Sequence, residues 1–294
     1  MSLALKRAFF AFAAIWLAAG AAVQAADPDE GVPAGREAAE SDRLQDEQPM
    51  ADERLVNPVC PEAKRDSLTT PDMTLWDKVV KAHVRRGIVN YRAIAEEANF
   101  KKFLASWDCI NLLAARELGK KERAAMWLNI YNAHVVAHIL KHYPVSSVER
   151  IPDFYKQRVA RIGGRHTSAL HLADEVRYLL EDARVGFALC RGSLGGPTLR
   201  EEAYTAERLD AQLENQTRRF FADRNKFHLD KRGKFMRLSK VFRWEQRHIV
   251  RIEGAILKFF ARYVPPEDAE LVQSGTLSIR FSPYDADLNG ETLY

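Results

Sequence analysis

The chain has 294 residues, of which 47% are hydrophobic and 10% aromatic, with 15 Gly, 12 Pro and three Cys. These proportions are close to globular averages, so they exclude collagen-like, disulfide-scaffold and wholly disordered proteins. The 44 Lys and Arg exceed the 40 Asp and Glu by four charges, but this small excess is unevenly spread along the chain.

The N-terminus has the features of a secretory signal peptide. Lys6 and Arg7 precede an apolar run over residues 8–22, and small residues follow it up to Ala25. The run is shorter than the roughly 20 residues that span a bilayer. We therefore expect residues 1–25 to be cleaved, the protein to be periplasmic or secreted, and the mature chain to have no transmembrane segment.

Residues 26–68 are predicted to form an acidic disordered leader. Between Asp27 and Arg54 there are ten acids and three bases, a net charge of −7, and almost no bulky apolar side chains. Such a segment buries too little surface to offset the entropy lost on ordering. Cleavage of residues 1–25 would remove two bases and leave a mature charge of +2. Because the acidic segment carries −7, the residues from Leu55 onward carry +9. We expect one globular domain over residues 69–294.

Apolar spacing predicts a helical first half. Residues 76–84 and 100–118 show helical periodicity. The strongest pattern covers residues 122–142 and is apolar almost all round, which is typical of a helix in the middle of a domain. Pro144 ends this core helix, and Trp127 within it is expected to be mostly buried.

The second half is predicted to mix helices with short hairpins. One hairpin is expected around Gly163-Gly164 and another around the turn at 230–233. Residues 185–190 form a continuous apolar run that predicts a buried central strand, followed by a glycine-rich loop at 192–197. Further helices are expected at 172–180, 206–221 and 245–263, and a last strand at 276–281. The order predicts an α+β fold with an antiparallel sheet in the second half.

The three cysteines have no short spacing that would indicate a metal site or a redox motif. They are Cys60, Cys109 and Cys190. An oxidising compartment permits one disulfide with one cysteine left over, and the spacing does not choose the pair. Because Cys190 ends the apolar run, we interpret it as a free cysteine that packs as a small hydrophobe.

Five short blocks in order make residues 76–289 resemble the bacterial and plant family called domain of unknown function 547. The blocks are Val89-Asn90-Tyr91; residues 125–133 (Ala-Met-Trp-Leu-Asn-Ile-Tyr-Asn-Ala) with Tyr143-Pro144; Phe187-Ala188-Leu189 with Pro197 and Leu199-Arg200; residues 238–244 (Leu-Ser-Lys-Val-Phe-Arg-Trp); and Tyr284-Asp285 with Leu288-Asn289. Since members of the family are mostly uncharacterised, the resemblance implies little about function.

The family pattern nevertheless includes a Glu-His pair, a His just before Phe-Ala-Leu and Cys residues in the loop after it. This set is similar to the Cys-His-acid hydrolases papain and transglutaminase, and it implies a fold of that kind. In these places the present chain has Val176-Arg177, Gly186, Arg191 and Gly196. Cys190 is one position early, which on a strand would turn its side chain to the opposite face. The resemblance therefore implies a pseudoenzyme.

Two groups of residues are candidate sites. The polar group comes from the core helix and the C-terminal blocks: Asn129, Tyr131, Asn132, Ser239, Trp244, Tyr284, Asp285 and Asn289. Buried amides need hydrogen-bond partners, so we expect this group to tie the C-terminal segment to the core helix, with a ligand site as the alternative. The loop group is Cys190, Arg191 and Ser193.

Two patterns are compatible with metal ions. His134, His138 and His142 stand four residues apart on one helix face, a spacing at which two imidazoles share a zinc ion. Asp285 and Asp287 open a sequence similar to a calcium loop, whose twelfth position lies beyond the last residue. We interpret the histidines as ordinary packed or exposed residues and the aspartates as part of the family block. No metal and no cofactor are expected.

A basic run lies between Arg218 and Arg251, with twelve bases, three acids and six interleaved aromatic residues. The simpler interpretation places the aromatic side chains inward and the bases in solvent. The alternative is a functional surface for anionic envelope polymers or lipid head groups, whereas nucleic acid is not an expected partner after secretion.

These observations predict a binding or accessory protein of the cell envelope. Its expected partner is an anionic envelope component or another protein. Two enzymatic alternatives stay open. One is a cysteine-type hydrolase or amide-bond enzyme, and the other is a metal-dependent hydrolase built on the helix histidines.

Overall fold

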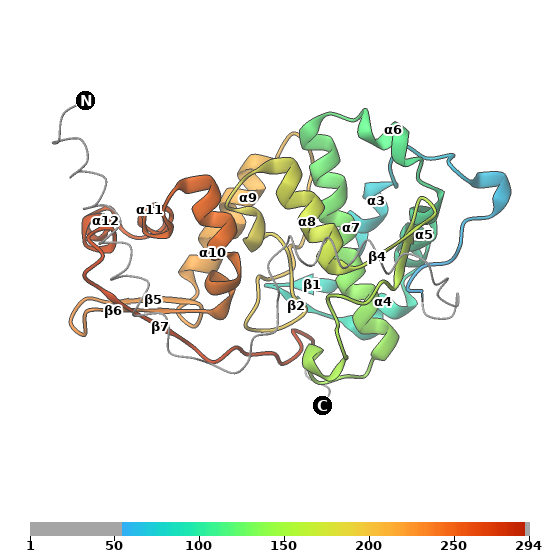
Figure 1. Ribbon diagram of the computed structural model, residues 1–294. Coiled ribbons are helices and arrows are strands. Elements are labelled where there is room, and N and C mark those ends of the chain that lie inside the picture. Colours follow the sequence, from blue (N-terminus) through green and yellow to red (C-terminus); the bar gives the residue numbers. More distant parts are fainter. Residues whose placement is uncertain (1–54, 292–294) are drawn as a thin grey trace, which may run out of the picture.

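The computed structural model describes residues 55–291 and shows two lobes side by side (Figure 1). The helices are α3 (Met73–His83), α4 (Tyr91–Glu96), α5 (Ala98–Ser106), α6 (Leu112–Arg116), α7 (Lys120–His142), α8 (Ala169–Leu180), α9 (Leu209–Ala222), α10 (Lys240–Glu253), α11 (Ile256–Ala261) and α12 (Pro266–Gln273). The strands are β1 (Val84–Arg85), β2 (Ile88–Val89), β3 (Ala160–Ile162), β4 (Arg165–Thr167), β5 (Phe227–Asp230), β6 (Phe235–Leu238) and β7 (Ser278–Phe281). The predicted signal peptide and most of the predicted leader lie outside the described residues.

Helix α7 is the centre of the larger lobe, as the periodicity predicts. Its side chains are buried on nearly all sides, and it packs along α8 (Figure 1). Trp127 differs from the prediction because it is only partly buried. A second hydrophobic cluster fills the other lobe, around Phe242 of α10 and the aromatic residues of α9, β5 and α11. Of the helices within residues 55–291, none is long and apolar enough to cross a membrane.

The predicted helix over residues 100–118 is interrupted in the structure. A 3-10 turn at Trp107–Cys109 ends α5, and α6 begins afresh after Asn111. The Asn111 side chain accepts hydrogen bonds from the backbone N–H groups of Leu113 and Ala114, both at 3.0 Å. Such a cap starts a new helix and therefore divides the apolar pattern. The predicted helix over 245–263 is likewise divided, at Gly254, whose φ is +79°.

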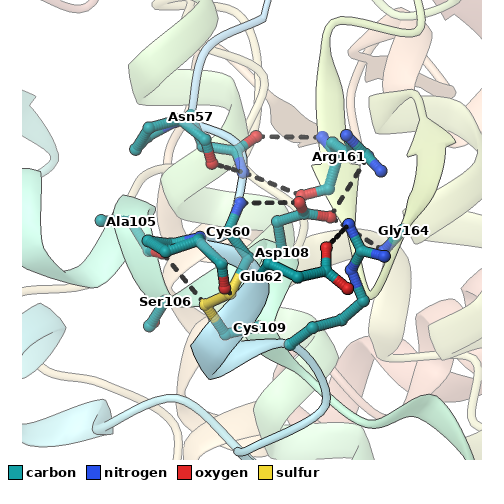
Figure 2. Close-up of a disulfide and its surroundings, with 12 residues drawn as sticks. Asn57, Cys60, Glu62, Ala105, Ser106, Asp108, Cys109, Arg161 and Gly164 are labelled. Carbon is teal, nitrogen blue, oxygen red and sulfur yellow. Dashed lines mark hydrogen bonds and ion pairs between the residues drawn. A yellow bond between two sulfur atoms is a disulfide. The ribbon is translucent and has the colours of Figure 1, made fainter.

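Residues 55–68 pack against the larger lobe, although the sequence assigns them to the leader. A disulfide joins Cys60 to Cys109, which the spacing had left open (Figure 2). The buried carboxylate of Asp108 accepts from the Cys60 N–H at 2.8 Å and from the Gly164 N–H at 2.8 Å. Asn57 exchanges two hydrogen bonds with the backbone of β3. The packed fold therefore includes residues before the predicted boundary at 69.

Both predicted hairpins form. In the first, Gly163 and Gly164 have φ values of +53° and +79°, which the tight turn between β3 and β4 requires. In the second, β5 and β6 pair antiparallel, and β7 then joins β6 in parallel. The fold is α+β as predicted, with small sheets that are antiparallel except for this last pair.

The predicted strand over 185–190 is wrong. Residues Val185–Phe187 form a 3-10 turn, and the next residues run on without strand pairing. Their backbone groups bind side chains of α7 instead of a neighbouring strand. The segment is nevertheless buried, so its apolar composition reflects burial and not strand pairing.

The C-terminal segment after β7 crosses from the smaller lobe to the larger one (Figure 1). Isolated bridges pair Leu288 with Ser193, Asp287 with Ser147 and Gly290 with Val89. This segment therefore joins the glycine-rich loop to the end of β2.

Candidate functional site

The polar side chains of α7 hold the segment that leads into the glycine-rich loop. Asn132 accepts the Cys190 N–H at 2.9 Å and donates to the Ala188 carbonyl at 3.2 Å. The Tyr131 hydroxyl donates to the Cys190 carbonyl at 3.0 Å. These bonds replace the ladder that a strand would have supplied, so the buried backbone is satisfied by side chains.

Asn129 binds the backbone of a second segment, at Tyr204. Its side chain accepts the Tyr204 N–H at 2.9 Å and donates to the Tyr204 carbonyl at 2.8 Å. Because the amide groups of Asn129 and Asn132 both bind backbone, their contacts support the structural role over a ligand site.

The C-terminal residues of the predicted polar group contact the glycine-rich loop rather than the core helix. The hydroxyls of Ser193 and Tyr284 lie 2.6 Å apart, and Ser239 donates to the Gly195 carbonyl at 3.3 Å. The Gly195 N–H donates to the Asp285 carbonyl at 2.8 Å. The expected tie between the C-terminal segment and α7 therefore runs through the loop, which both of them contact.

Asn289 fastens the end of this segment to the larger lobe. Its side chain accepts from the Tyr91 hydroxyl at 2.7 Å and donates to the Gly87 carbonyl at 3.1 Å. These bonds span about two hundred residues of sequence, so they close the fold across both lobes.

The positions at which the chain departs from the family pattern meet around one carboxylate, that of Glu245 on α10. Arg177 binds it in a two-pronged contact, with Nη2 2.7 Å from Oε1 and Nε 3.3 Å from Oε2. Arg191 reaches Oε1 at 3.3 Å. A Cβ atom at Gly186 would lie 2.5 Å from the Glu245 carboxyl carbon, and one at Gly196 would lie 2.7 Å from the Arg191 Cβ. Neither position therefore has room for a His or Cys side chain beside this ion cluster.

The ion cluster of Arg177, Glu245 and Arg191 is buried and charged. The side chain of Glu245 is 2% exposed, and those of Arg177 and Arg191 are 18% and 12% exposed. Burial by itself raises the pKa of the Glu245 carboxyl, but the two guanidinium groups outweigh it and hold the pKa below its usual value. The Arg191 guanidinium also stacks 4.5 Å from the centre of the Trp244 ring. The cluster therefore has no group poised to exchange a proton near neutral pH.

Cys190 is a free, buried cysteine, as expected, although it is not on a strand. Its side chain is 1% exposed, and burial raises the pKa of the thiol to about 12. A backbone hydrogen bond from Gly192 and the charge of Arg191 oppose this shift without cancelling it. A nucleophilic cysteine needs an accessible thiolate, which this environment disfavours.

The histidines of α7 lie in the core and near its end. His134 and His138 are fully buried, and His138 stacks on Phe154 with ring centres 4.6 Å apart, whereas His142 is exposed. Burial lowers the pKa of His134 to about 3 and that of His138 to about 4, so both are neutral at pH 7. Among residues 55–291, no three His, Cys, Asp or Glu side chains come together as metal ligands.

The aspartates of the calcium-like sequence lie on the exposed C-terminal segment. Asp285 accepts the Asp287 N–H at 3.1 Å, and both carbonyls accept N–H groups of the glycine-rich loop. Their described contacts are thus those of a turn that docks on this loop.

An open cleft of about 560 Å³ lies between the glycine-rich loop and the C-terminal segment, and we call it the basic cleft. It brings together five of the predicted site residues: Ser193, Ser239, Tyr284, Asp285 and Asn289. The other predicted residues, among them Cys190 and Arg191, do not line it. The cleft therefore separates the predicted residues that border an open space from those that do not.

Three bases line this cleft, and none of them had been identified as a site residue. Arg86 and Arg237 are exposed and form no ion pair among residues 55–291. Lys226 is 5% exposed, and its Nζ lies 3.3 Å from the Asp223 carboxylate. Burial lowers the pKa of Lys226, and Asp223 offsets only part of the shift. Lys226 and Arg237 belong to the basic run between Arg218 and Arg251, and this run is the sequence pattern that could have indicated them. No pattern in the sequence indicated Arg86.

Comparison with known proteins identifies one family. Residues 115–221 match the family described as protein of unknown function, DUF547. No curated protein and no solved structure matches the chain, and the expected likeness to papain or transglutaminase stays a prediction. The match covers α7, α8, the glycine-rich loop and α9, and it leaves out Glu245 and most of the lining of the basic cleft. The chain therefore contains a domain of the DUF547 family.

Proposed function

We propose that this protein is a non-catalytic binding protein of the cell envelope and that it takes an anionic ligand in the basic cleft. The observation that carries the proposal is the ion cluster of Arg177, Glu245 and Arg191. It occupies the positions where the resemblance implies thiol and imidazole chemistry, and the nearby thiol of Cys190 is buried with a raised pKa. The envelope location rests on the predicted signal peptide.

The charge of the basic cleft supports an anionic ligand. Arg86, Lys226 and Arg237 face two acids, Asp223 and Asp285, so the lining carries a net charge of +1. A smaller adjoining hollow of about 360 Å³ shares Arg86 and Lys226 and adds Arg219. Cations that line a concave surface raise the local concentration of anions and give charge-assisted hydrogen bonds to carboxylates and phosphates.

The hydroxyls at the same cleft supply the remaining contacts. Ser193, Ser239 and Tyr284 border it. The hydroxyls of Ser193 and Tyr284 bind each other, and that of Ser239 donates to the Gly195 carbonyl and accepts the Val241 N–H. Each hydroxyl retains further acceptor capacity, and such groups orient a bound ligand while the cations supply the affinity.

The binding test uses citrate and pyrophosphate as probes and isothermal titration calorimetry as the readout. Lys226→Gln and Arg237→Gln are expected to weaken binding about tenfold, since a charged hydrogen bond contributes about 1.5–3 kcal/mol. Arg232→Gln, in the exposed β5–β6 turn of the same basic run, is the matched control and is expected to bind as the wild type does. The ligand proposal fails if neither probe binds, or if all three variants bind equally well.

The cysteine-hydrolase alternative is tested by alkylation. We expect Cys190 to react slowly with iodoacetamide in the native protein and rapidly in urea. Rapid native labelling with an apparent pKa well below the free-thiol value of about 8.5 would favour the hydrolase instead. The metal-dependent alternative would need a ligand beyond the two buried histidines of α7.

A further inference from the structure

A second cavity, of about 640 Å³, lies on the larger lobe away from the basic cleft, with which it shares no lining residue. We call it the arginine pocket, after the four arginines that line it: Arg116, Arg123, Arg158 and Arg165. Helix α6, the start of α7, the β3–β4 hairpin and the start of α8 form its walls. All its lining residues except Leu112 lie within the DUF547 match.

The charge of the arginine pocket is strongly unbalanced. Four arginines face one acid, Glu175, so the net charge of the lining is +3 even with its histidines neutral. Arg116 and Arg165 form no ion pair among residues 55–291. The first turn of α8 also contributes to the lining, and the N-terminal end of a helix favours negative charge.

Polar atoms at the arginine pocket lack hydrogen-bond partners. Thr167 is 5% exposed, and its hydroxyl makes no hydrogen bond within residues 55–291. His166 Nδ1 and Arg123 Nε are also buried atoms without a hydrogen-bond partner within residues 55–291. A buried polar atom without a partner costs about 1–3 kcal/mol, so native structures hold few of them. Three of the eleven such atoms within residues 55–291 lie at this pocket, where a bound ligand would supply their hydrogen-bond partners.

The arginine pocket also has apolar lining residues. Trp127 lines it together with Leu112, Ile162 and Leu172. Along the buried middle of α7, Trp127 is the one large aromatic side chain that keeps part of its surface exposed. An aromatic surface beside convergent polar groups is typical of a small-molecule site, and this volume is in the usual range of about 300–1,000 Å³.

The walls of the pocket are held in place before any ligand arrives. Asp108 fixes the tip of the β3–β4 hairpin through Gly164 and is itself bound to the disulfide through the Cys60 N–H (Figure 2). Arg123 donates to the Arg116 carbonyl at 2.9 Å, which joins α7 to α6. A preformed site loses less entropy on binding.

We propose that the arginine pocket binds an anionic amphiphile, with a phosphate or carboxylate head against Arg123 and Arg165 and an apolar chain or ring against Trp127. The arginines alone would suit any anion, and Trp127 alone would suit any apolar group. Their presence in one cavity selects molecules that carry both.

Three soluble probes, used below their micelle concentrations on the full chain, separate these contributions. Octyl phosphate carries both groups, inorganic phosphate carries only the head, and octyl glucoside carries only the chain. Calorimetry is expected to show octyl phosphate binding at least tenfold more tightly than either of the others. Equal affinity for phosphate and octyl phosphate, or no binding of octyl phosphate, would overturn the proposal.

Variants then assign the binding to this pocket. Arg165→Gln changes an exposed hairpin residue and is expected to weaken octyl phosphate binding about tenfold. Arg92→Gln, an exposed arginine on α4, and Lys226→Gln in the basic cleft are the controls and are expected to have no effect. Octyl phosphate should also change the fluorescence of the wild type, and Trp127→Phe should abolish that change. Unchanged affinity in Arg165→Gln together with an unchanged signal in Trp127→Phe would place the ligand elsewhere and refute the proposal.

Sedimentation with vesicles identifies the source of the amphiphile. Co-sedimentation with phosphatidylglycerol vesicles but not with phosphatidylcholine vesicles, lost in Arg165→Gln, would identify a membrane lipid. Octyl phosphate binding without co-sedimentation would identify a soluble amphiphile, and both results support the pocket. Co-sedimentation that Arg165→Gln and Trp127→Phe leave unchanged would contradict it.

Discussion

The sharpest test of the ion cluster is Glu245→Gln, which removes one negative charge and changes the shape of the side chain little. Glu245 is the only acid in contact with Arg177 and Arg191 within the cluster, and its side chain is 2% exposed. After the substitution, Arg191 keeps no carboxylate within the cluster, and Arg177 keeps only the contact of 3.0 Å with Asp174, whose side chain is 51% exposed.

The expected loss follows from the contacts. The glutamine has one oxygen in place of two, so if that oxygen keeps the 2.7 Å contact with Arg177 Nη2, its NH₂ group faces Arg177 Nε, donor against donor. Removal of one partner from a buried ion pair costs about 3–5 kcal/mol, because the remaining charge is uncompensated. In a domain of this size, that corresponds to a fall in Tm of about 6–20 °C.

Urea unfolding at pH 7, followed by circular dichroism, measures the change in the free energy of unfolding. The matched control is Glu253→Gln, the same substitution on the same helix. Glu253 pairs with Arg262 at 2.6 Å, and the side chains of the two residues are 15% and 49% exposed. A pair of this kind contributes about 0–1 kcal/mol, so the control should unfold almost as the wild type does.

A loss below about 1 kcal/mol in Glu245→Gln, or one equal to that of the control, would refute this account of the cluster. If Glu245→Gln does not fold, the triple variant Arg177→Met, Glu245→Met, Arg191→Met keeps the test open. Replacement of the three charged groups together by apolar side chains is expected to recover most of the stability, because no buried charge is then left unpaired and Asp174, the other partner of Arg177, is 51% exposed.

Three further predictions concern stability. Between pH 7 and pH 5, the free energy of unfolding should fall by about 4 kcal/mol through His134 and His138, because the unfolded chain binds protons with pKa values near 6.5 while the buried rings, with pKa values of about 3 and about 4, do not. This stability is kept above pH 6.5 and lost as the pH falls, and replacement of both histidines by Leu should abolish that part of the pH dependence in urea titrations. Peptide mapping without reduction should recover Cys60 linked to Cys109, and Ser at both positions should lower the urea-derived free energy of unfolding by about 4 kcal/mol. Gly195→Ala should lower it by about 1–3 kcal/mol, because the new Cβ would lie 2.7 Å from a backbone oxygen of the C-terminal segment. A Gly195→Ala protein as stable as the wild type would show that the C-terminal segment moves away from the new Cβ at little cost in free energy.

The long elements of the fold were predictable because their signals are local. The nearly all-round apolar pattern of α7 predicts a core helix, and Gly163-Gly164 predicts the first hairpin through the positive φ values that its turn requires. Periodicity could not locate the break between α5 and α6, which depends on the cap at Asn111.

The apolar run over 185–190 shows why local reasoning failed elsewhere. Its composition reports burial, but burial alone does not distinguish a strand from a turn whose backbone is bound by distant side chains. The partner of this segment is Asn132, which is 58 residues away from Cys190, and nothing within the run itself indicates it.

The sequence by itself determined the fold class and the core helix, because these depend on residue type and near neighbours. Only the tertiary structure decided that Arg177, Gly186 and Arg191 meet at Glu245, that Cys60 pairs with Cys109, and that bases gather in two separate cavities. Each of these depends on contacts between segments that are tens of residues apart. Such contacts form only when the packed helices bring the segments together, and no periodic pattern along the chain records them.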